Sequence, residues 1–260
     1  MQDRKIIHLF LVIACMCVVA LATVAQTKKP KPKTTQAQGT KVAAPEPPLP
    51  RGNKMKEGAE QTAKASKVFG EIMGTPDKGI PSDLLNKAEC VAVFPNVVKA
   101  GFIVGAKAGR GVASCRTKTG WSAPAFLEIK GGSIGLQAGG SSTDVVLLFM
   151  NTEGMRKLVA NKVELGADAS IAAGPVGREA AASTDASMSS EILSYSRSKG
   201  LFAGISLKGS VVSAEKSDME DTYGDTISAT QVVEASNTRA PMEVQSFANK
   251  LGQYSTRKAM

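Results

Sequence analysis

The hydrophobic and polar positions between residues 120 and 150 predict the centre of a β-sheet. Residues 126–129 form one short, mostly apolar run, and glycine pairs at 131–132 and 139–140 bracket a second run. Residues 145–150 form a third run, which begins with two β-branched residues. Because glycine removes side chains from a strand and permits sharp bends, we predict three strands joined by tight turns in a curved or partly closed antiparallel sheet.

Helical periodicity appears on both sides of this centre. Residues 56–73 place Ala65, Phe69 and Ile72 near one face, and Gly74 is a plausible stop. An amphipathic helix of this kind either lies on a membrane or packs on its own domain, and the pattern fits both interpretations. Further helices are expected after Pro81, at about 151–159, at 229–235 and from Pro241, where Val244, Phe247, Ala248 and Leu251 form an apolar stripe.

The remaining runs predict further strands and loops. Residues 90–94 read as a buried strand that ends at Pro95, and residues 101–116 read as a strand pair joined by a glycine turn. Residues 195–212 predict another hairpin, and the acidic stretch 215–225 predicts a loop. The fold class expected from these patterns is α+β, with a curved glycine-rich antiparallel sheet flanked by several helices.

Three segments of different composition organise the chain. Residues 1–25 have a charged start, an apolar middle and small residues at the end, which predicts a signal peptide and an exported protein of the periplasm or cell envelope. Cleavage before a lipidated Cys15, or an uncleaved anchor, are the alternatives. Residues 26–56 are rich in Lys, Pro and Thr and predict a disordered linker, and residues 57–256 form the domain.

Net charge is concentrated in the linker. The whole chain has a formal net charge of +9, and residues 26–58 contribute +6 of it through eight basic and two acidic side chains. The high pI therefore belongs to a tail, and it does not indicate a nucleic-acid partner. Lysines of the tail could hold an anionic surface, at roughly 1 kcal/mol for each charge near it, or the tail is simply a solvated spacer.

Cysteine and histidine usage limits the chemistry. Removal of the signal leaves Cys90 and Cys115, which form either a disulfide or two buried free thiols. The sole histidine, His8, leaves with the signal. A mature chain without histidine cannot use Ser-His or Cys-His catalysis, and it lacks the usual nitrogen ligand of zinc. We expect no enzyme activity, no cofactor and no metal.

Short motifs that resemble catalytic signatures lack the spacing, order or following element that those signatures require. Residues 101–116 match neither a Walker loop nor GxGxxG, and no helical pattern follows them. Ser196 to Lys199 spells SxxK and Lys118 to Gly120 spells KTG, but their order is reversed relative to serine β-lactamases and a strand pattern follows SxxK. The spacing of carboxylates such as Asp144 and Asp168 gives no argument for a hydrolase.

A series of segments in fixed order resembles the SYLF domain family, also described as the yeast actin-regulator family. The resemblance covers about residues 57–255 and rests on CVAVFP, GRGVASCR, GWSAPAF, SIGLQAGGSSTDVVLLFMN, LGADASIAAGPVGR and YSRSKGLFAGISLKGS. It implies a lipid-binding module whose partner is an anionic phospholipid or membrane surface. An envelope scaffold acting through protein-protein contacts is the alternative, and an actin partner does not suit an exported chain.

Cations near glycine-rich bends are the candidate ligands of a lipid head group, because arginine chelates phosphate and small neighbours let the head group approach. They are Lys107, Arg110, Arg178, Arg197 and Lys199. The alternative for each is a surface charge or an ion pair with Asp144, Asp168 or Glu179. Trp121 is a candidate for the membrane interface, with a place in the core as its alternative.

Overall fold

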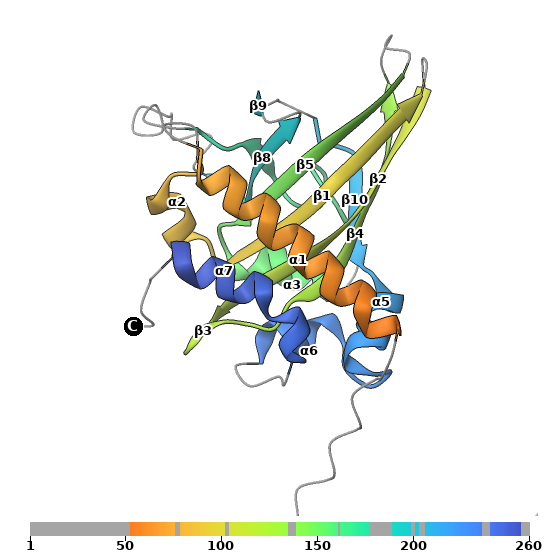
Figure 1. Cartoon of the computed structure of the whole chain (residues 1–260). Helices are drawn as coiled ribbons and strands as arrows, with labels where there is room; N and C mark the ends of the chain where they lie inside the picture. Colours follow the sequence, from red (N-terminus) through yellow and green to blue (C-terminus); the bar gives the residue numbers. More distant parts are fainter. Residues whose placement is uncertain are drawn as a thin grey trace, which may run out of the picture. The chain divides into compact units, whose positions relative to one another are not determined.

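A curled, open sheet of ten strands forms the centre of the part of the chain that the structure describes (Figure 1). The structure, a computed structural model, describes residues 53–75, 79–101, 104–134, 139–160, 162–176, 189–198, 201–202, 206–235 and 240–255. All of these lie in one compact unit, residues 46–260. The predicted signal peptide and most of the predicted linker lie outside the described residues.

The strands run in the order β6-β10-β4-β2-β1-β5-β8-β7, with β3 paired to β2 and β9 paired to β8. All pairs are antiparallel except β7 with β8. The predicted α+β class and curved sheet are therefore confirmed, with one parallel pair added. The strands are β1 (Cys90–Gly101), β2 (Val104–Thr117), β3 (Gly120–Trp121), β4 (Ala125–Ile134), β5 (Gly139–Phe149), β6 (Val163–Glu164), β7 (Ile171–Ala173), β8 (Ile192–Ser198), β9 (Leu201–Phe202) and β10 (Ser210–Ala214).

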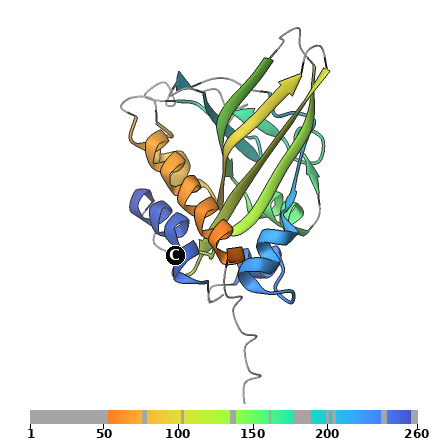
Figure 2. The same cartoon turned by 45° about the vertical axis from the view of Figure 1, so that its right-hand side comes forward.

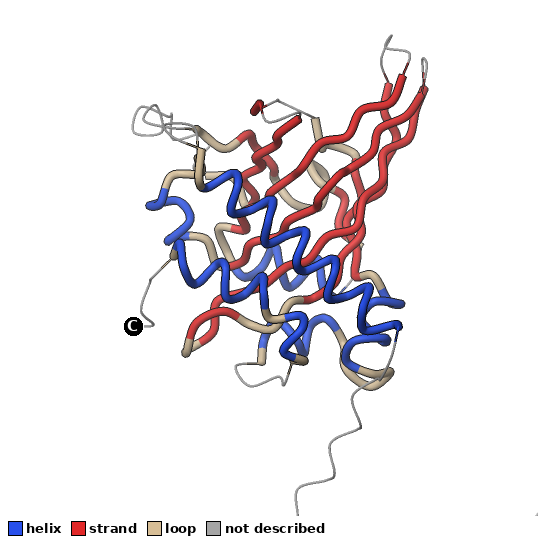
Figure 3. Tube along the Cα trace, in the orientation of Figure 1, coloured by secondary structure: helices blue, strands red, loops and turns tan. Residues whose placement is uncertain are grey.

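Helices α1 and α7 lie side by side across one face of the sheet (Figures 2 and 3). Phe69 of α1 meets Phe247 of α7 edge to face, with ring centroids 6.3 Å apart. The described helices are α1 (Asn53–Met73), α2 (Ser82–Lys87), α3 (Thr152–Ala160), α5 (Lys216–Tyr223), α6 (Ala229–Glu234), the short 3-10 helix η2 (Met242–Val244) and α7 (Ser246–Tyr254). The helices predicted from periodicity are confirmed, and the apolar stripe of the last one packs against α1 as well as the sheet.

The core lies between α1 and the sheet and inside the curl of the sheet. Residues 90–95 of β1 and 145–149 of β5 are buried at every position, which means that both faces of these strands are covered. Three apolar residues of α1, namely Ala65, Phe69 and Ile72, are fully buried. The amphipathic pattern of α1 is thus satisfied by packing on its own domain.

Strand β1 does not end at Pro95, contrary to the sequence prediction. A register shift between Val93 and Val98 marks a bulge, and Asn96 within it has a positive φ of 54°. Proline is tolerated at such a bulge because no ladder hydrogen bond is required of its nitrogen. The strand then continues to Gly101.

Residues 101–116 do not form a strand pair, because residues 104–117 make the single long strand β2. Its glycines admit neighbouring atoms instead of turning the chain. A Cβ at Gly111 would lie 2.5 Å from both the Phe94 ring and the Val93 carbonyl oxygen. The sequence prediction misread close packing as a turn.

Two predictions for the C-terminal half also need correction. The acidic stretch predicted as a loop forms α5, because the Glu215 side chain accepts the Asp218 amide hydrogen at 2.6 Å and caps the helix. Strands β8 and β9 do form a hairpin, but β10 pairs with β4 and β6 instead of extending it.

Strands β1, β2, β4 and β5 extend beyond the ends of the neighbouring strands of the sheet. Strand β10 pairs with β4 only as far as Gly131, and β8 pairs with β5 only from Asp144 onward. The strand ends beyond this point extend past the helices (Figures 1 and 2). We call residues 97–101, 104–108, 130–134 and 139–143 the distal sheet.

Candidate functional site

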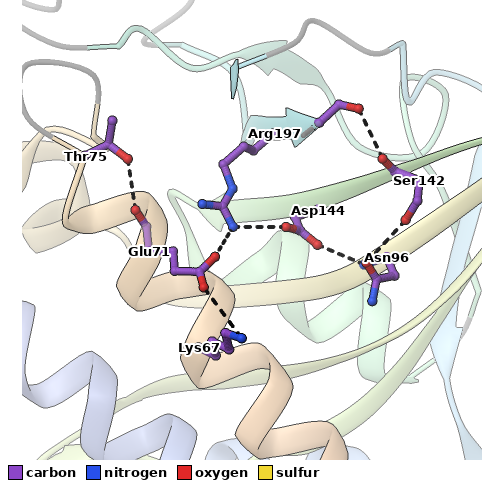
Figure 4. Close-up of polar contacts among 8 residues, drawn as sticks. Lys67, Glu71, Thr75, Asn96, Ser142, Asp144 and Arg197 are labelled. Atoms are coloured by element: carbon purple, nitrogen blue, oxygen red, sulfur yellow. Dashed lines mark hydrogen bonds and ion pairs between the residues drawn. The ribbon is translucent and has the colours of Figure 1, made fainter. Parts of the chain in front are cut away.

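Arg197 lies at the centre of a polar cluster that joins α1 to the sheet (Figure 4). Its side chain is 12% exposed, and its Nη2 contacts Glu71 of α1 and, at 3.2 Å, Asp144 of β5. Burial alone would lower the pKa of Arg197, but hydrogen bonds and charges from the two carboxylates raise it. The ion-pair alternative with Asp144 therefore describes Arg197.

The cluster extends to the bulge of β1. The backbone N–H of Asn96 donates to Asp144 Oδ1 at 3.0 Å, and the Ser142 hydroxyl donates to the side-chain oxygen Oδ1 of Asn96 at 3.3 Å. Ser198 Oγ donates to the Ser142 carbonyl at 3.2 Å. These contacts hold α1, the bulge and β8 in one arrangement (Figure 4). Both carboxylates contact the Nη2 of Arg197, whereas its Nε is buried without a hydrogen-bond partner among the described residues.

Lys107 is nearly enclosed despite its charge. It is 8% exposed, and its Nζ donates to the Ser206 carbonyl at 2.9 Å. Burial lowers the pKa of Lys107, and the positive charge of Lys99 lowers it further. Its aliphatic stem passes Gly131, where a Cβ would lie 3.0 Å from the Lys107 Cε.

Arg110 is the most accessible of the predicted cations that the structure describes. Its side chain is 56% exposed and its Nη1 lies 3.7 Å from Asp218 Oδ1 of α5. Burial and then the charge of Glu215 raise the pKa of Asp218 to about 6, whereas Arg110 acts to lower it. The arginine thus partly compensates a buried carboxyl group.

Trp121 lies beyond the end of β2 that is opposite the distal sheet. It is half-buried, and the Arg116 guanidinium stacks 4.2 Å from the centre of its ring. Arg116 also donates to the carbonyl groups of Leu85 and Ala88. This arrangement supports packing of α2 onto the sheet.

Cys90 and Cys115 are joined by a disulfide in the structure. They are directly opposite each other on β1 and β2, with Cα atoms 4.0 Å apart. Of the two alternatives that the sequence left open, the structure contains the bonded one.

The predicted lipid-binding residues do not gather at one place. Lys107 lies inside the curl, Arg110 faces α5, and Arg197 is held by two carboxylates on the α1 side. Arg178 and Lys199 lie outside the described residues, and their role stays a prediction.

The distal sheet is the feature that the sequence reasoning missed. Large hydrophobic side chains are exposed at three described positions, and two of them, Val98 (51%) and Val104 (73%), belong to the distal sheet. Lys99 and Lys130 are exposed beside them. The signal in the sequence was the alternation of small and larger residues over residues 101–116, which we attributed to a strand pair with a glycine turn.

The charge of this region is of one sign. Residues 97–109 and 130–143 contain Lys99, Lys107 and Lys130 and no acidic residue. Lys130 has an acidic partner just outside these residues, since the Oε2 of Glu128 lies 2.6 Å from its Nζ. The end of the sheet is therefore a cationic surface with exposed apolar side chains.

An open pocket elsewhere is unsuited to an anionic head group. It has a volume of about 930 Å³ and lies beside β4, β10, α5 and α6. Four carboxylates and two lysines line it: Glu128, Glu215, Glu220, Asp225, Lys162 and Lys216. The excess of negative charge would repel phosphate.

No helix among the described residues is long and apolar enough to cross a membrane. No group of three or more His, Cys, Asp or Glu side chains there is arranged to hold a metal ion.

Comparisons with known proteins identify the family of this chain. Residues 130–254 match the family model described as Las17-binding protein actin regulator. The chain is 36% identical over 197 residues to LAS seventeen-binding protein 3 of Saccharomyces cerevisiae, a match that covers 72% of this chain and 41% of that protein.

Animal relatives give a similar result. SH3 domain-containing YSC84-like protein 1 of Bos taurus is 33% identical over 196 residues, which cover 74% of this chain and 57% of that protein. The Homo sapiens protein of the same name is 32% identical over 190 residues, covering 72% of this chain and 55% of that protein. The matches thus span about half the length of these relatives. The yeast relative is named as a binding protein, and the family model is described as an actin regulator. The chain belongs to the family of Las17-binding protein actin regulators, the SYLF domain family that its sequence resembles.

Proposed function

We propose that this protein binds anionic lipid surfaces without catalysing a reaction, and that the distal sheet is its contact surface. The observation that carries the proposal is the combination of two exposed lysines, Lys99 and Lys130, with no acidic residue in residues 97–109 and 130–143 and two exposed valines at the end of the sheet. An anionic membrane offers both partners that such a surface needs, namely negative charge and an apolar layer beneath it.

The expected electrostatic contribution is modest. Each exposed cation near an anionic leaflet contributes about 1 kcal/mol, and the effect falls off within a Debye length. Lys99 supplies the full effect, Lys130 shares its charge with Glu128, and Lys107 is largely committed to the Ser206 carbonyl. Binding should therefore weaken steeply as salt concentration rises.

The basic tail would add to this attraction. Residues 26–58 carry a net charge of +6 by sequence. A tail of this kind binds any polyanion, so it supplies affinity without selecting a lipid. The domain has to supply whatever selectivity exists.

Packing argues against the first helix as the membrane anchor. Phe69 and Ile72 of α1 are fully buried, and the Arg197 cluster fixes the helix to β5 and β8. Insertion of α1 would require unpacking of these side chains, each of which contributes about 1.5–3 kcal/mol through burial. The exposed valines need no such rearrangement.

Flotation of the full chain with vesicles tests the proposal. A variant with Lys28, Lys29, Lys31 and Lys33 changed to Gln separates the tail from the domain. We expect both proteins to float with vesicles that contain phosphatidylglycerol and to remain at the bottom with pure phosphatidylcholine. Flotation of the unchanged chain alone would assign binding to the tail, and flotation of neither would overturn the proposed function.

A protein partner is the second candidate function. The observation that favours it is that a relative is named as a binder of LAS seventeen, a protein. Photo-crosslinking from Val98 in cells distinguishes the two, since a scaffold would give one dominant protein adduct.

We also propose that the protein acts outside the cytosol, in the periplasm or cell envelope. The support is the signal-like composition of residues 1–25, together with the Cys90–Cys115 disulfide, a bond that persists in oxidising compartments. Intact mass of the protein purified from cells tests this, because removal of residues 1–25 would leave a chain that begins near Gln26.

A further inference from the structure

The distal sheet has one face made almost entirely of small apolar residues. Cross-strand partners share a face, and side chains two apart in a strand point the same way. Val98 pairs with Ala108, Ala100 pairs with Ala106, and Val104 lies two residues from Ala106. All five side chains are exposed.

The same face is covered by α1 nearer the centre of the molecule. Ser142 pairs with Val98, and Asp144 lies two residues further along β5 on the same face. Asp144 contacts Arg197, which in turn contacts Glu71 of α1. The apolar face therefore begins where α1 ends its cover, and no described helix lies over it (Figure 1).

Exposed lysines lie on both faces of the distal sheet. Lys130 pairs with Ala108 and shares the apolar face, whereas Lys99 pairs with Lys107 and points to the opposite face. The strands that carry the apolar residues thus bring positive charge to the same level along the sheet. An uncharged protein partner would gain nothing from these lysines, whereas an anionic bilayer would gain from both lysines and valines.

Resting on the proposed function, we infer that the α1-side face of the distal sheet enters the interfacial layer of an anionic bilayer, with Val98 and Val104 as its apolar anchors, while α1 remains on the sheet.

Insertion by this face is shallow. The outer edges of β4 beyond Gly131 and of β5 before Asp144 have no strand partner among the described residues. Unpaired backbone groups are costly in hydrocarbon but are satisfied by water and head groups at the interface. From Val98 to Gly101 the strand rises about 10 Å, a length that matches the depth at which interfacial elements bury their apolar face.

The first test removes apolar character while keeping shape. Val98→Thr combined with Val104→Thr retains β-branched side chains, so the strands should persist. Met242→Gln is the matched control, because Met242 is 85% exposed on η2, outside the distal sheet. We expect the double variant to bind phosphatidylglycerol vesicles at least about fivefold more weakly and the control to bind as the unchanged chain does. Equal binding by all three would overturn the inference.

The second test places a reporter at the anchor. In Val104→Trp, we expect the added tryptophan to shift to shorter wavelength on vesicles and to be quenched by lipids brominated near the head group. The native Trp121, on β3 beyond the end of β2 that is opposite the distal sheet, should show neither change in the unchanged chain. Flotation of the variant without quenching would overturn insertion and leave the proposed function standing, whereas absence of flotation in the unchanged chain would overturn both.

Two alternatives give distinct results in the same experiments. If the apolar face instead binds a second copy of the chain, sedimentation would show a dimer that Val98→Thr and Val104→Thr dissociate in the absence of lipid. If α1 inserts, amide exchange in residues 53–73 would accelerate on vesicles. Either result would overturn the inference, which requires a lipid-free monomer and unchanged protection of α1.

Discussion

At the scale of single residues, the buried charges of this protein are explained by packing. Arg197, Lys107 and Asp218 all carry charge into nearly enclosed sites, and each has a described partner there. Residues of this kind are common catalytic candidates, because perturbed pKa values gather at functional sites. Here their partners are backbone carbonyls and side chains that join one element to another.

Asp218 predicts a specific dependence of stability on pH. Its folded-state pKa of about 6 lies above the ordinary aspartate value of 3.8, so the native state binds this proton more tightly than the unfolded state. Its contribution to the free energy of unfolding is therefore full below pH 4, falls as the pH rises towards 6, and changes little above that. The loss is at most about 3 kcal/mol.

The Asp218→Asn variant isolates this effect. We expect its urea-unfolding free energy to lack the decline between pH 4 and 6 and to exceed that of the unchanged protein at pH 7. Asp225→Asn, at an exposed position, serves as control and should keep the decline. A variant that retains the full decline would show that Asp218 is not the titrating group.

At the scale of elements, one arginine adds a charged link between α1 and the sheet to the apolar packing of Phe69 and Ile72. The Arg197 guanidinium bridges Glu71 and Asp144, two carboxylates from different elements. Without the arginine, Asp144 keeps the Asn96 backbone amide and Glu71 keeps the exposed Lys67, but the charge that joins the two carboxylates is lost. Loss of one partner of a buried pair costs up to 3–5 kcal/mol, and partial exposure of Glu71 reduces this.

We therefore expect Arg197→Met to lower the free energy of unfolding by about 2 kcal/mol. Arg156→Met is a matched control, because Arg156 also contacts two carboxylates, Glu153 and Glu234, but in exposed positions. The control should cost no more than about 1 kcal/mol. Chemical denaturation measures both, and equal losses would refute a special role for the Arg197 cluster.

The sequence predicted elements better than it predicted how they meet. The long amphipathic pattern of α1 and the stripe in α7 were sufficient because each needs only local periodicity. Strand β1 was cut short because Pro95 normally ends a strand, and only the bulge at Asn96 shows why it does not. The extended β2 was misread because Gly111 and its neighbours serve contacts with a strand that is distant in sequence.

The candidate site was harder to predict for a related reason. Arg110, Arg197 and Lys107 were chosen for their type and for nearby glycines, which are local properties. Whether a cation is free depends on which carboxylate or carbonyl the fold brings to it, and Glu71, Asp218 and Ser206 come from far along the chain. Exposure of Val98 and Val104 likewise depends on where the covering helix ends.

At the scale of the whole molecule, the two ends of the sheet differ in what covers them. One end is covered by helices, closed by the disulfide and stabilised by the Arg197 cluster. The other end extends as four strands with lysines and exposed valines. On the proposed function, the covered end keeps its packing while the bare end meets a membrane.

Charge reversal at the distal sheet tests this claim most directly. Lys99→Glu with Lys130→Glu is compared in the full chain with Lys118→Glu with Lys216→Glu, two exposed lysines beyond the distal sheet that give the same change in net charge. Flotation with phosphatidylglycerol vesicles should weaken at least about tenfold for the distal pair and much less for the control pair. Equal weakening by both pairs, or none by either, would contradict the assignment of the distal sheet as the membrane-binding surface.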